Sequence, residues 1–213
     1  MRRFHLPSLV HCSDQETAIT ALLPHDTGVL AATTAFGKTI LAMRMMAERG
    51  RNTLVLVHRR QLMDQWIERL TAFSNMPRDA IGIIGGGRRK PKGQVDVALI
   101  QSLVRKGEVD DIVGNYGHLV VDECHHLSAV SFELVARRSK VRYVLGLSAT
   151  VTRKDGHHPI IVMQCGPVRH RVDARSEAAK RHSITWCGSG IPASNFKRHW
   201  TLLSLLSRMF SRK

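Results

Sequence analysis

The sequence has few cysteines, and no apolar run in its 213 residues approaches the roughly eighteen that a membrane-spanning helix needs. The lack of such a run disfavours a membrane anchor. The opening residues 1–7 are basic, but they lack the continuous apolar core of a secretion signal. The four cysteines are scattered and include no Cys-x-x-Cys pair, so we expect free thiols in a reducing compartment. These absences predict a cytoplasmic protein that does not bind a membrane.

Acidic residues are also scarce. The chain has 17 Asp and Glu residues against 32 Lys and Arg, which gives a formal net charge of +15 and a pI near 10.7. This surplus favours a polyanionic partner through screened attraction and counterion release, but it does not choose between DNA, RNA and an anionic membrane. With 43% hydrophobic residues, the chain can bury one sizeable core and carry a small appendage.

Apolar segments rich in β-branched residues alternate along the chain with segments of helical period. The apolar segments predict strands at residues 29–32, 53–57, 95–100, 118–121 and 141–147. Helices are predicted over residues 40–46, ending at Gly50, and over residues 61–73. Residues 85–92, three glycines followed by basic residues, are predicted to form a loop. Strands that are apolar throughout and separated by crossover helices indicate an α/β fold with a central parallel sheet flanked by helices.

Residues 32–39 lie between a predicted strand and a predicted helix and end in Gly37-Lys38-Thr39. The usual phosphate loop has glycine, four residues of any type, then Gly-Lys-Ser/Thr; here Ala32 stands at the first glycine position. Backbone N–H groups of such a loop and the positive end of the helix can surround phosphates. Lys38 would reach the β- and γ-phosphates of ATP, and the Thr39 hydroxyl would bind Mg²⁺. The alternative is a chance Gly-Lys-Thr in a turn.

The fourth predicted strand is followed by two carboxylates, Asp122 and Glu123. Ligands of open parallel sheets gather at the carboxyl ends of the strands. Asp122 would hold Mg²⁺ there, and Glu123 would polarise the attacking water; a structural cap after a strand is the alternative. Cys124, His125 and His126 carry zinc-ligand atoms, but adjacent residues on an extended chain point to opposite faces, which disfavours a zinc site.

Three motifs, in this order, resemble motifs I, II and III of the superfamily 2 DEAD/DEAH-box helicases. They are Gly37-Lys38-Thr39, Asp122-Glu123-Cys124-His125 and Ser148-Ala149-Thr150. Weaker matches are residues 55–66, which resemble motif Ia, and residues 98–103, which resemble a later nucleic-acid-contacting motif. Residues 146–156 are most similar to the branch that contains repair helicases and the motor subunits of restriction enzymes. The resemblance covers residues 15–173 and implies a RecA-like P-loop NTPase domain, the ATP-binding first motor domain of a helicase or translocase.

The resemblance also implies roles for individual residues. Residues expected to contact ATP are Gln15, at the adenine, and Ala35, Phe36, Gly37, Lys38 and Thr39 in the phosphate loop. Residues expected near the sugar–phosphate backbone, where they would position a strand without reading its sequence, are His58, Arg59, Arg60, Gln101 and Ser102. Residues expected to couple nucleotide state to the strand-binding face are Ser148, Ala149 and Thr150. The corresponding alternatives are an ordinary exposed glutamine, a solvated helix start and a polar strand end.

The family's second motor domain has no counterpart in this sequence. Nothing after residue 173 resembles its Gln-x-x-Gly-Arg-x-x-Arg motif, whose arginine can raise the rate by about 10³–10⁵. Residues 174–213 form a basic tail that we expect to be disordered, amphipathic or out of frame, with a membrane-surface helix as the sharper alternative. Residues 1–14 match the family poorly. We therefore expect a truncated chain, or one completed by a second RecA-like domain in trans, that binds ATP·Mg²⁺ and nucleic acid weakly and hydrolyses ATP slowly or not at all alone.

Three functions are open at this point. The leading one is an ATP-driven motor domain that acts on nucleic acid, with DNA favoured over RNA. The second is a non-hydrolysing fragment that binds nucleic acid in response to ATP. The third is another P-loop enzyme such as a small kinase, against which Ser148-Ala149-Thr150 and Gln101-Ser102 argue.

Overall fold

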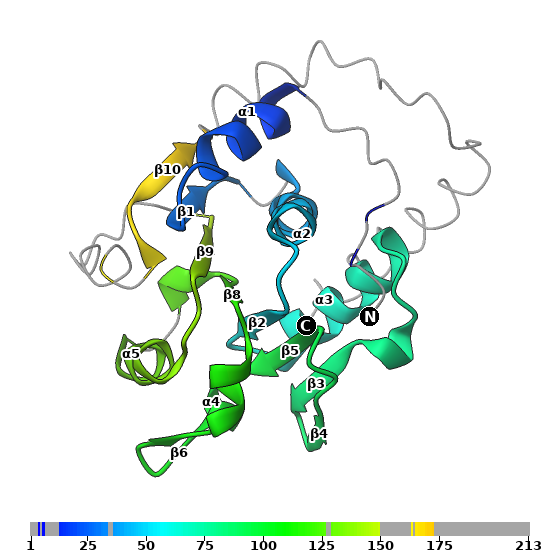
Figure 1. The fold of residues 1–213 in the computed structure, drawn as a ribbon, viewed down its shortest axis with the longest axis vertical. Helices are drawn as coiled ribbons and strands as arrows, with labels where there is room; N and C mark the ends of the chain where they lie inside the picture. The colour runs from blue at the N-terminus through cyan, green and yellow to red at the C-terminus, as the bar shows by residue number, and fades with distance from the viewer. Residues whose placement is uncertain are drawn as a thin grey trace, which may run out of the picture. The chain divides into compact units, whose positions relative to one another are not determined.

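Eight strands form one mostly parallel sheet in the computed structural model (Figure 1). The structure describes residues 4, 6, 13–33, 36–126, 129–149, 163 and 165–172. The strands lie in the order β10 (Val168–Arg171), β1 (Thr27–Ala31), β9 (Tyr143–Ser148), β8 (His118–Val121), β2 (Thr53–Val57), β5 (Val95–Leu99), β3 (Gly82–Gly85) and β4 (Arg88–Lys90). Within this sheet β4, at one edge, is antiparallel to β3, and the other neighbours are parallel. The predicted α/β fold with a central parallel sheet is confirmed.

Helices cover both faces of the sheet (Figure 1). One face carries α1 (Ser13–Leu22), α2 (Lys38–Arg49) and α3 (Arg60–Phe73), and the other carries α4 (Ile100–Leu103) and α5 (Ala129–Arg138). Short 3₁₀ helices and a small hairpin complete the described elements: η2 (Arg78–Ala80), η3 (Asp111–Asn115), η4 (Cys124–His126), β6 (Val104–Arg105) and β7 (Glu108–Val109). Among the described residues, no helix has the length and apolar character needed to cross a bilayer.

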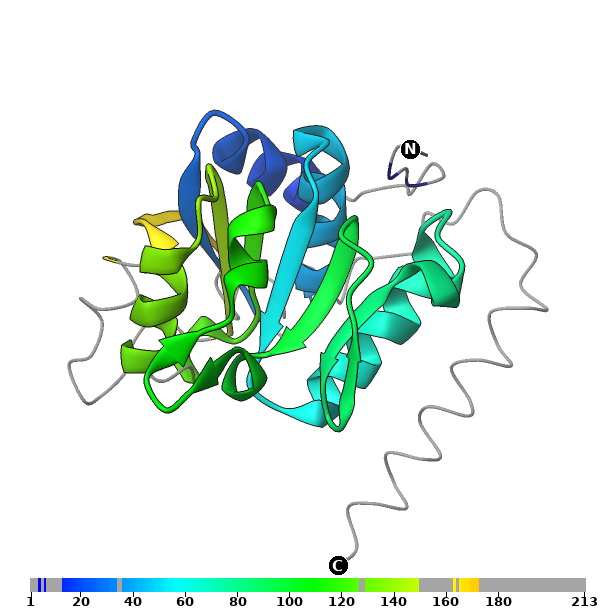
Figure 2. The ribbon, with the colours of Figure 1, turned by 60° about the horizontal axis from the view of Figure 1, so that its bottom comes forward.

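Strand β2 shows why the central strands are apolar throughout. Its side chains alternate between the two faces, as in any strand. Val55 and Val57 belong to the apolar core under α1, α2 and α3. Leu54 and Leu56 belong to the core under α4 and α5. Every residue of β2 is therefore buried, and the same is true of its neighbour β8; Figure 2 shows β2 and β5 running side by side as the cyan and green arrows.

Three strands of this sheet are absent from those predicted from the sequence: the internal strand β3 and the edge strands β4 and β10. Residues 85–92 were expected to be a loop, but Arg88–Lys90 form β4, which pairs with β3. β10 is missed for a similar reason, because Val168–Arg171 is rich in basic residues and none of its side chains is fully buried. An edge strand needs backbone partners on one side only and can leave its side chains in water, so it requires no apolar pattern.

The chain divides into two units, Met1–Glu177 and Ala178–Lys213. All described residues lie in the first unit. The predicted limits of the ATP-binding domain, 15–173, and of the tail, 174–213, stay predictions. Residues 173–213 lie outside the described residues, as do most of residues 1–14.

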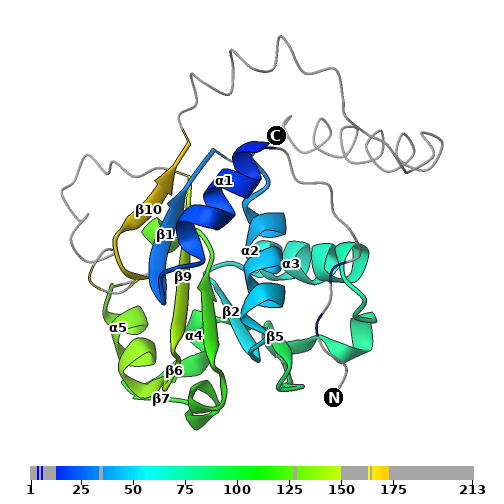
Figure 3. The same ribbon diagram turned by 45° about the horizontal axis from the view of Figure 1, so that its top comes forward.

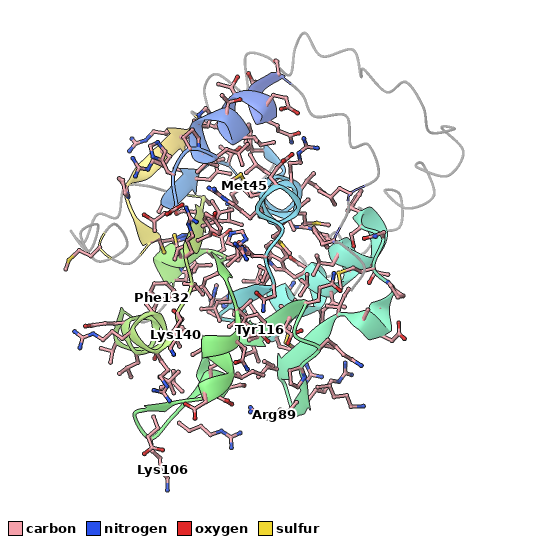
Figure 4. The ribbon with its side chains drawn as sticks, viewed as in Figure 1. Met45, Arg89, Lys106, Tyr116, Phe132 and Lys140 are labelled. Carbon is pink, nitrogen blue, oxygen red and sulfur yellow. The ribbon has the colours of Figure 1, made fainter. Side chains whose placement is uncertain are left out.

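The buried carboxylate of Asp96, on β5, links this strand to the loop before it and to Tyr116. Its oxygens accept backbone N–H bonds from Lys92 and Gly93 at 3.0–3.2 Å, and the Tyr116 hydroxyl also donates to it (Tyr116 is labelled in Figure 4). Burial and the nearby Asp96 charge raise the pKa of Tyr116, which keeps the phenol protonated as a donor. Gly82 on the adjacent strand is required here, because a Cβ atom would lie 2.1 Å from Asp96 Oδ1.

His118 makes the fold sensitive to acid. It lies fully buried on β8, with its Nδ1 3.5 Å from Thr53 Oγ1. Burial, assisted by the nearby Arg49 charge, lowers the pKa of His118 to about 3 from 6.5. As the pH falls below 6.5, His118 becomes protonated in the unfolded chain but stays neutral in the folded chain, so acid favours unfolding. Between pH 7 and pH 5, His118 should remove about 2 kcal/mol of stability.

Urea unfolding of the wild type and of His118→Asn at both pH values measures this contribution. The variant keeps a polar atom near Thr53 but does not titrate. We expect the loss between pH 7 and pH 5 to be smaller in the variant by about 2 kcal/mol. Equal losses in the two proteins would show that His118 does not govern the acid response.

Candidate nucleotide-binding site

The three motif segments follow three neighbouring strands. β1 leads to the phosphate loop, β8 leads to Asp122 and Glu123, and β9 ends at Ser148. In the sheet these strands lie in the order β1-β9-β8 and are parallel. Their carboxyl ends therefore share one edge, where open parallel sheets bind ligands. The backbone ties the segments together there, because Ala32 N–H donates to the Ser148 carbonyl at 3.0 Å.

The described part of the phosphate loop is shaped for an anion at the start of α2. Gly37 is the N-cap of α2 and has φ 84°, ψ 34°, a left-handed conformation that favours glycine. As a glycine, the N-cap residue has no side chain to bond the first N–H groups of the helix, and these groups and the positive end of the helix dipole suit a phosphate. Ala35 lies outside the described residues, and Phe36 is buried.

Gln15 reaches the phosphate loop from α1. Its Nε2 donates to the Phe36 carbonyl at 2.9 Å, and a Cβ atom on Gly37 would lie 2.8 Å from the same Nε2. The contact places this side chain against the loop, next to where the nucleotide would sit. Whether it also contacts adenine, as the resemblance implies, stays a prediction.

Lys38 and Glu123 meet across the site. Lys38 Nζ lies 3.3 Å from Glu123 Oε1, although 85 residues separate them in the sequence. Lys38 is 6% exposed and Thr39 is 7% exposed, so the lysine charge is largely removed from water and its ion pair with Glu123 is weakly screened. Glu123 itself has φ 46°, which turns the chain sharply after β8 and aims the side chain back at the loop.

Asp122 is held by an indole. Trp66 Nε1 on α3 donates to Asp122 Oδ2 at 2.7 Å, and the Glu123 N–H donates to Oδ1 at 3.0 Å. Burial raises the pKa of Asp122; the Trp66 hydrogen bond and the Lys38 charge oppose that rise, while the Glu123 charge adds to it. From the same helix, Arg69 Nη1 donates to Thr39 Oγ1. Thus α3 contacts both residues predicted to bind Mg²⁺.

Ser148 is connected to Glu123 through a histidine. Ser148 Oγ lies 3.0 Å from His125 Nδ1, and the same nitrogen lies 3.4 Å from Glu123 Oε2. All three residues are buried or half-buried. This chain of contacts could transmit a change at the nucleotide to the end of β9. Ala149 is half-buried, and Thr150 lies outside the described residues.

The predicted strand-binding residues also gather at this edge of the sheet. His58 follows β2 and Gln101 follows β5, its neighbour, and Gln101 Nε2 donates to the His58 carbonyl at 3.0 Å. Arg59 and Arg60 are exposed at the start of α3, and Ser102 is half-buried. Burial, and then the His126 and Arg59 charges, lower the pKa of His58, which favours its neutral form at pH 7.

The residues present fit a magnesium ion. Thr39 offers a hydroxyl and Asp122 a carboxylate, the hard oxygen ligands that Mg²⁺ prefers, and this ion usually takes few protein ligands because water and phosphate complete its shell. Glu123 Oε2 is buried and accepts no hydrogen bond from the described residues, which leaves an acceptor for a water beside that position. In the described part of the chain, no group of three or more His, Cys, Asp and Glu residues is arranged to hold a metal, including Cys124, His125 and His126.

Three residues of this site were given no role from the sequence. Trp66 lies at the end of the segment that resembles motif Ia, Arg69 lies three residues beyond it, and His125 lies in the segment that resembles motif II. Their partners are 56, 30 and 23 residues away along the chain. The Gln65-Trp66 pair was a usable signal, because a tryptophan among buried positions of a helix needs a partner for its N–H.

Solved structures of helicases share this fold. The crystal structure of UvsW of bacteriophage T4 superposes with a TM-score of 0.65 at 20% identity, covering 78% of this chain and 35% of that one. The helicase domain of Hef from Pyrococcus furiosus superposes with a TM-score of 0.63 at 19% identity, covering 81% of this chain and 40% of that one. The fold is thus that of a RecA-like helicase domain.

Sequence comparisons identify the family. Residues 9–153 match the family described as "Type III restriction enzyme, res subunit". DNA 3'-5' translocase XPB2 of Sulfurisphaera tokodaii is 30% identical over 166 residues, which are 78% of this chain and 36% of that protein. DNA 3'-5' helicase XPB of Mycobacterium tuberculosis is 30% identical over 162 residues, 73% of this chain and 29% of that protein. The chain belongs to the type III restriction enzyme res subunit family, and it is a helicase-type ATP-binding domain of superfamily 2 that spans about a third of these relatives' length.

Proposed function

We propose that this chain binds ATP·Mg²⁺ and a DNA strand as the first motor domain of a DNA helicase or translocase. The observation that carries the proposal is the convergence of the loop after β1, the carboxylates after β8 and Ser148 of β9 at one edge of the sheet, with Lys38 3.3 Å from Glu123. The two XPB relatives are named for DNA, whereas a 34% identical viral relative is named a putative RNA helicase, so DNA is the strand that we propose first. The net positive charge of the chain would favour binding to DNA and to RNA alike.

The ion pair between Lys38 and Glu123 suggests how the site responds to nucleotide. Phosphate oxygens entering the loop would replace Glu123 as the partner of Lys38, since both are anions and the triphosphate carries more charge. Glu123 would then be free to accept a proton from the attacking water. Thr39 and Asp122 would hold Mg²⁺, which supplies charge neutralisation at the β- and γ-phosphates when bound. Gln15, Ala35, Phe36 and Gly37 would complete the nucleotide site.

The strand would lie across the ends of β2 and β5. Arg59 and Arg60 are exposed there and suit contacts to phosphates, while Gln101 is fixed against His58 by its hydrogen bond. Ser148 would couple the nucleotide state to this surface, since it reaches Glu123 through His125. The domain of this function would be residues 15–173. A second RecA-like domain, supplied in trans, would add the arginine that speeds hydrolysis, and without it we expect slow turnover.

ATP turnover, measured with and without single-stranded DNA, tests the proposal. DNA should stimulate the turnover of the wild type, and addition of a separate second RecA-like domain should raise it further. Nucleotide binding without turnover under every condition would instead support the non-hydrolysing fragment. Turnover that ignores DNA and yields a phosphorylated small molecule would support the kinase and overturn the motor function.

A further inference from the structure

Helix α3 contacts both residues predicted to bind Mg²⁺. Trp66 Nε1 donates to Asp122 Oδ2 at 2.7 Å, and Arg69 Nη1 donates to Thr39 Oγ1. Trp66 and Arg69 are three residues apart, so they project from the same face of the helix. That face is turned toward α2, which carries Thr39 and lies beside α3 (Figure 3). A single helix therefore contacts two predicted ligands, one on α2 and one in the turn after β8.

The hydrogen bond from Trp66 to Asp122 is well suited to hold the carboxylate in one orientation. Trp66 is 1% exposed, so water does not compete for its N–H, and the indole nitrogen is a donor only. Its partner is the Asp122 carboxyl group, which is itself 8% exposed, and a hydrogen bond to the ionised form of such a group is stronger than one between neutral groups. The Oδ2 atom keeps a further lone pair, and so does Oδ1, which accepts from the Glu123 N–H. The carboxylate is thereby oriented without being used up as a ligand.

The same helix starts at the predicted strand-binding residues. Arg59 is its N-cap and Arg60 its first residue. Arg60 and Trp66 are six residues apart, which is about 9 Å along a helix axis. Any displacement of α3 by phosphates bound at Arg59 and Arg60 would move the indole and with it the Asp122 carboxylate, because a helix moves as a unit.

We infer that Trp66 is a positioning residue, which orients the Asp122 carboxylate for Mg²⁺ and passes displacement of the strand-binding end of α3 to it. The inference rests on the proposed function, because it requires that the site bind magnesium nucleotide. Partners that orient a metal ligand typically affect metal affinity by about 10–100-fold. Trp66 itself touches neither nucleotide nor reacting atoms in this assignment.

A Trp66→Phe variant keeps an aromatic ring and removes only the N–H donor. A fluorescent ATP analogue is titrated in EDTA and at a series of Mg²⁺ concentrations. Mg²⁺ should tighten binding of the analogue, and we expect the Mg²⁺ concentration that gives half of this tightening to rise about tenfold in the variant. The affinity for the analogue in EDTA should stay unchanged. Leu70→Ala, on the same helix and equally buried, is the control for lost packing. It should lower stability without changing the Mg²⁺ dependence. An equal Mg²⁺ dependence in Trp66→Phe and wild type would overturn the inference.

Tryptophan fluorescence gives a second readout, which does not depend on whether Trp66→Phe folds. The sequence has three tryptophans, so replacing Trp186 and Trp200 with phenylalanine leaves Trp66 as the sole emitter. Magnesium nucleotide should change its emission, and an oligo-dT strand should change it as well. Arg59→Gln combined with Arg60→Gln should abolish the response to the strand alone. No response to either addition, in a protein that binds both, would overturn the inference; a wild type that binds no magnesium nucleotide would overturn the proposed function itself.

Discussion

Replacing Lys38 with alanine should weaken the binding of ATP·Mg²⁺ about 100-fold. The lysine is nearly buried and its ammonium group lies at the start of α2, where phosphates would be received. Each hydrogen bond from a charged group contributes about 1.5–3 kcal/mol, and loss of roughly 3 kcal/mol corresponds to about 100-fold in affinity. The variant also leaves Glu123 without its 3.3 Å partner, so an unopposed negative charge would repel the triphosphate.

Isothermal titration calorimetry with ATP·Mg²⁺ measures this loss. Lys140→Ala is the matched control, because Lys140 follows α5 on the other face of the sheet and is exposed (Figure 4). Glu123→Gln complements it by removing the other charge of the pair. That variant should keep the affinity within about threefold while any turnover falls by about 10²–10⁴, the range for loss of a general base. A Lys38→Ala protein that binds as tightly as Lys140→Ala would contradict the nucleotide site.

Replacing Asp96 with alanine should cost about 3–5 kcal/mol of folding stability. Three donors depend on this buried carboxylate: the N–H groups of Lys92 and Gly93 and the hydroxyl of Tyr116. Without it the buried Tyr116 hydroxyl loses its acceptor, and a buried unsatisfied group costs about 1–3 kcal/mol. The N–H groups of Lys92 and Gly93 lose theirs nearer the surface, where water replaces part of the loss. The space left beside Gly82 adds a cavity term.

Chemical unfolding in urea, at constant pH, gives the difference directly. Asp64→Ala is the control, since Asp64 is exposed on α3 and its loss should change stability by less than about 0.5 kcal/mol. Asp96→Asn should fall between the two, because its single side-chain oxygen can still accept while its NH₂ group faces donors. If Asp96→Ala were as stable as Asp64→Ala, the hydrogen bonds around Asp96 would have no net value.

The sequence predicts the fold class because its central strands are buried on both faces. β2 and β8 are apolar along nearly their whole length, which is typical of strands covered on both faces. Gly50 ends α2 in a left-handed conformation, as a glycine after a helical segment predicts. The edge strands β4 and β10 escape prediction, since backbone pairing at an edge does not need apolar side chains. Strand β3 was also not predicted, although it is internal and largely buried, because it has only four residues and two of them are glycines.

For the site, the residues that could be predicted are those whose chemistry is local in sequence. Lys38 stands in a loop between a strand and a helix, and Glu123 follows a strand, so their meeting follows from the parallel sheet alone. Trp66 and His125 could not be assigned in this way. Their partners, Asp122 and Ser148, come from other strands, and a hydrogen bond across 56 or 23 residues depends on packing that no local pattern encodes.

The outermost strand of the sheet has a consequence for how copies of this protein behave together. In the part of the chain that the structure describes, β4 pairs with β3 alone, and Arg88, Arg89 and Lys90 are all exposed along it. Arg89 is paired with Asp110, but a second molecule joining there, strand to strand, would bring Arg88 and Lys90 of both copies close together. Pairing of two copies through β4 should therefore be weaker in dilute buffer than at high salt, where the charges are shielded.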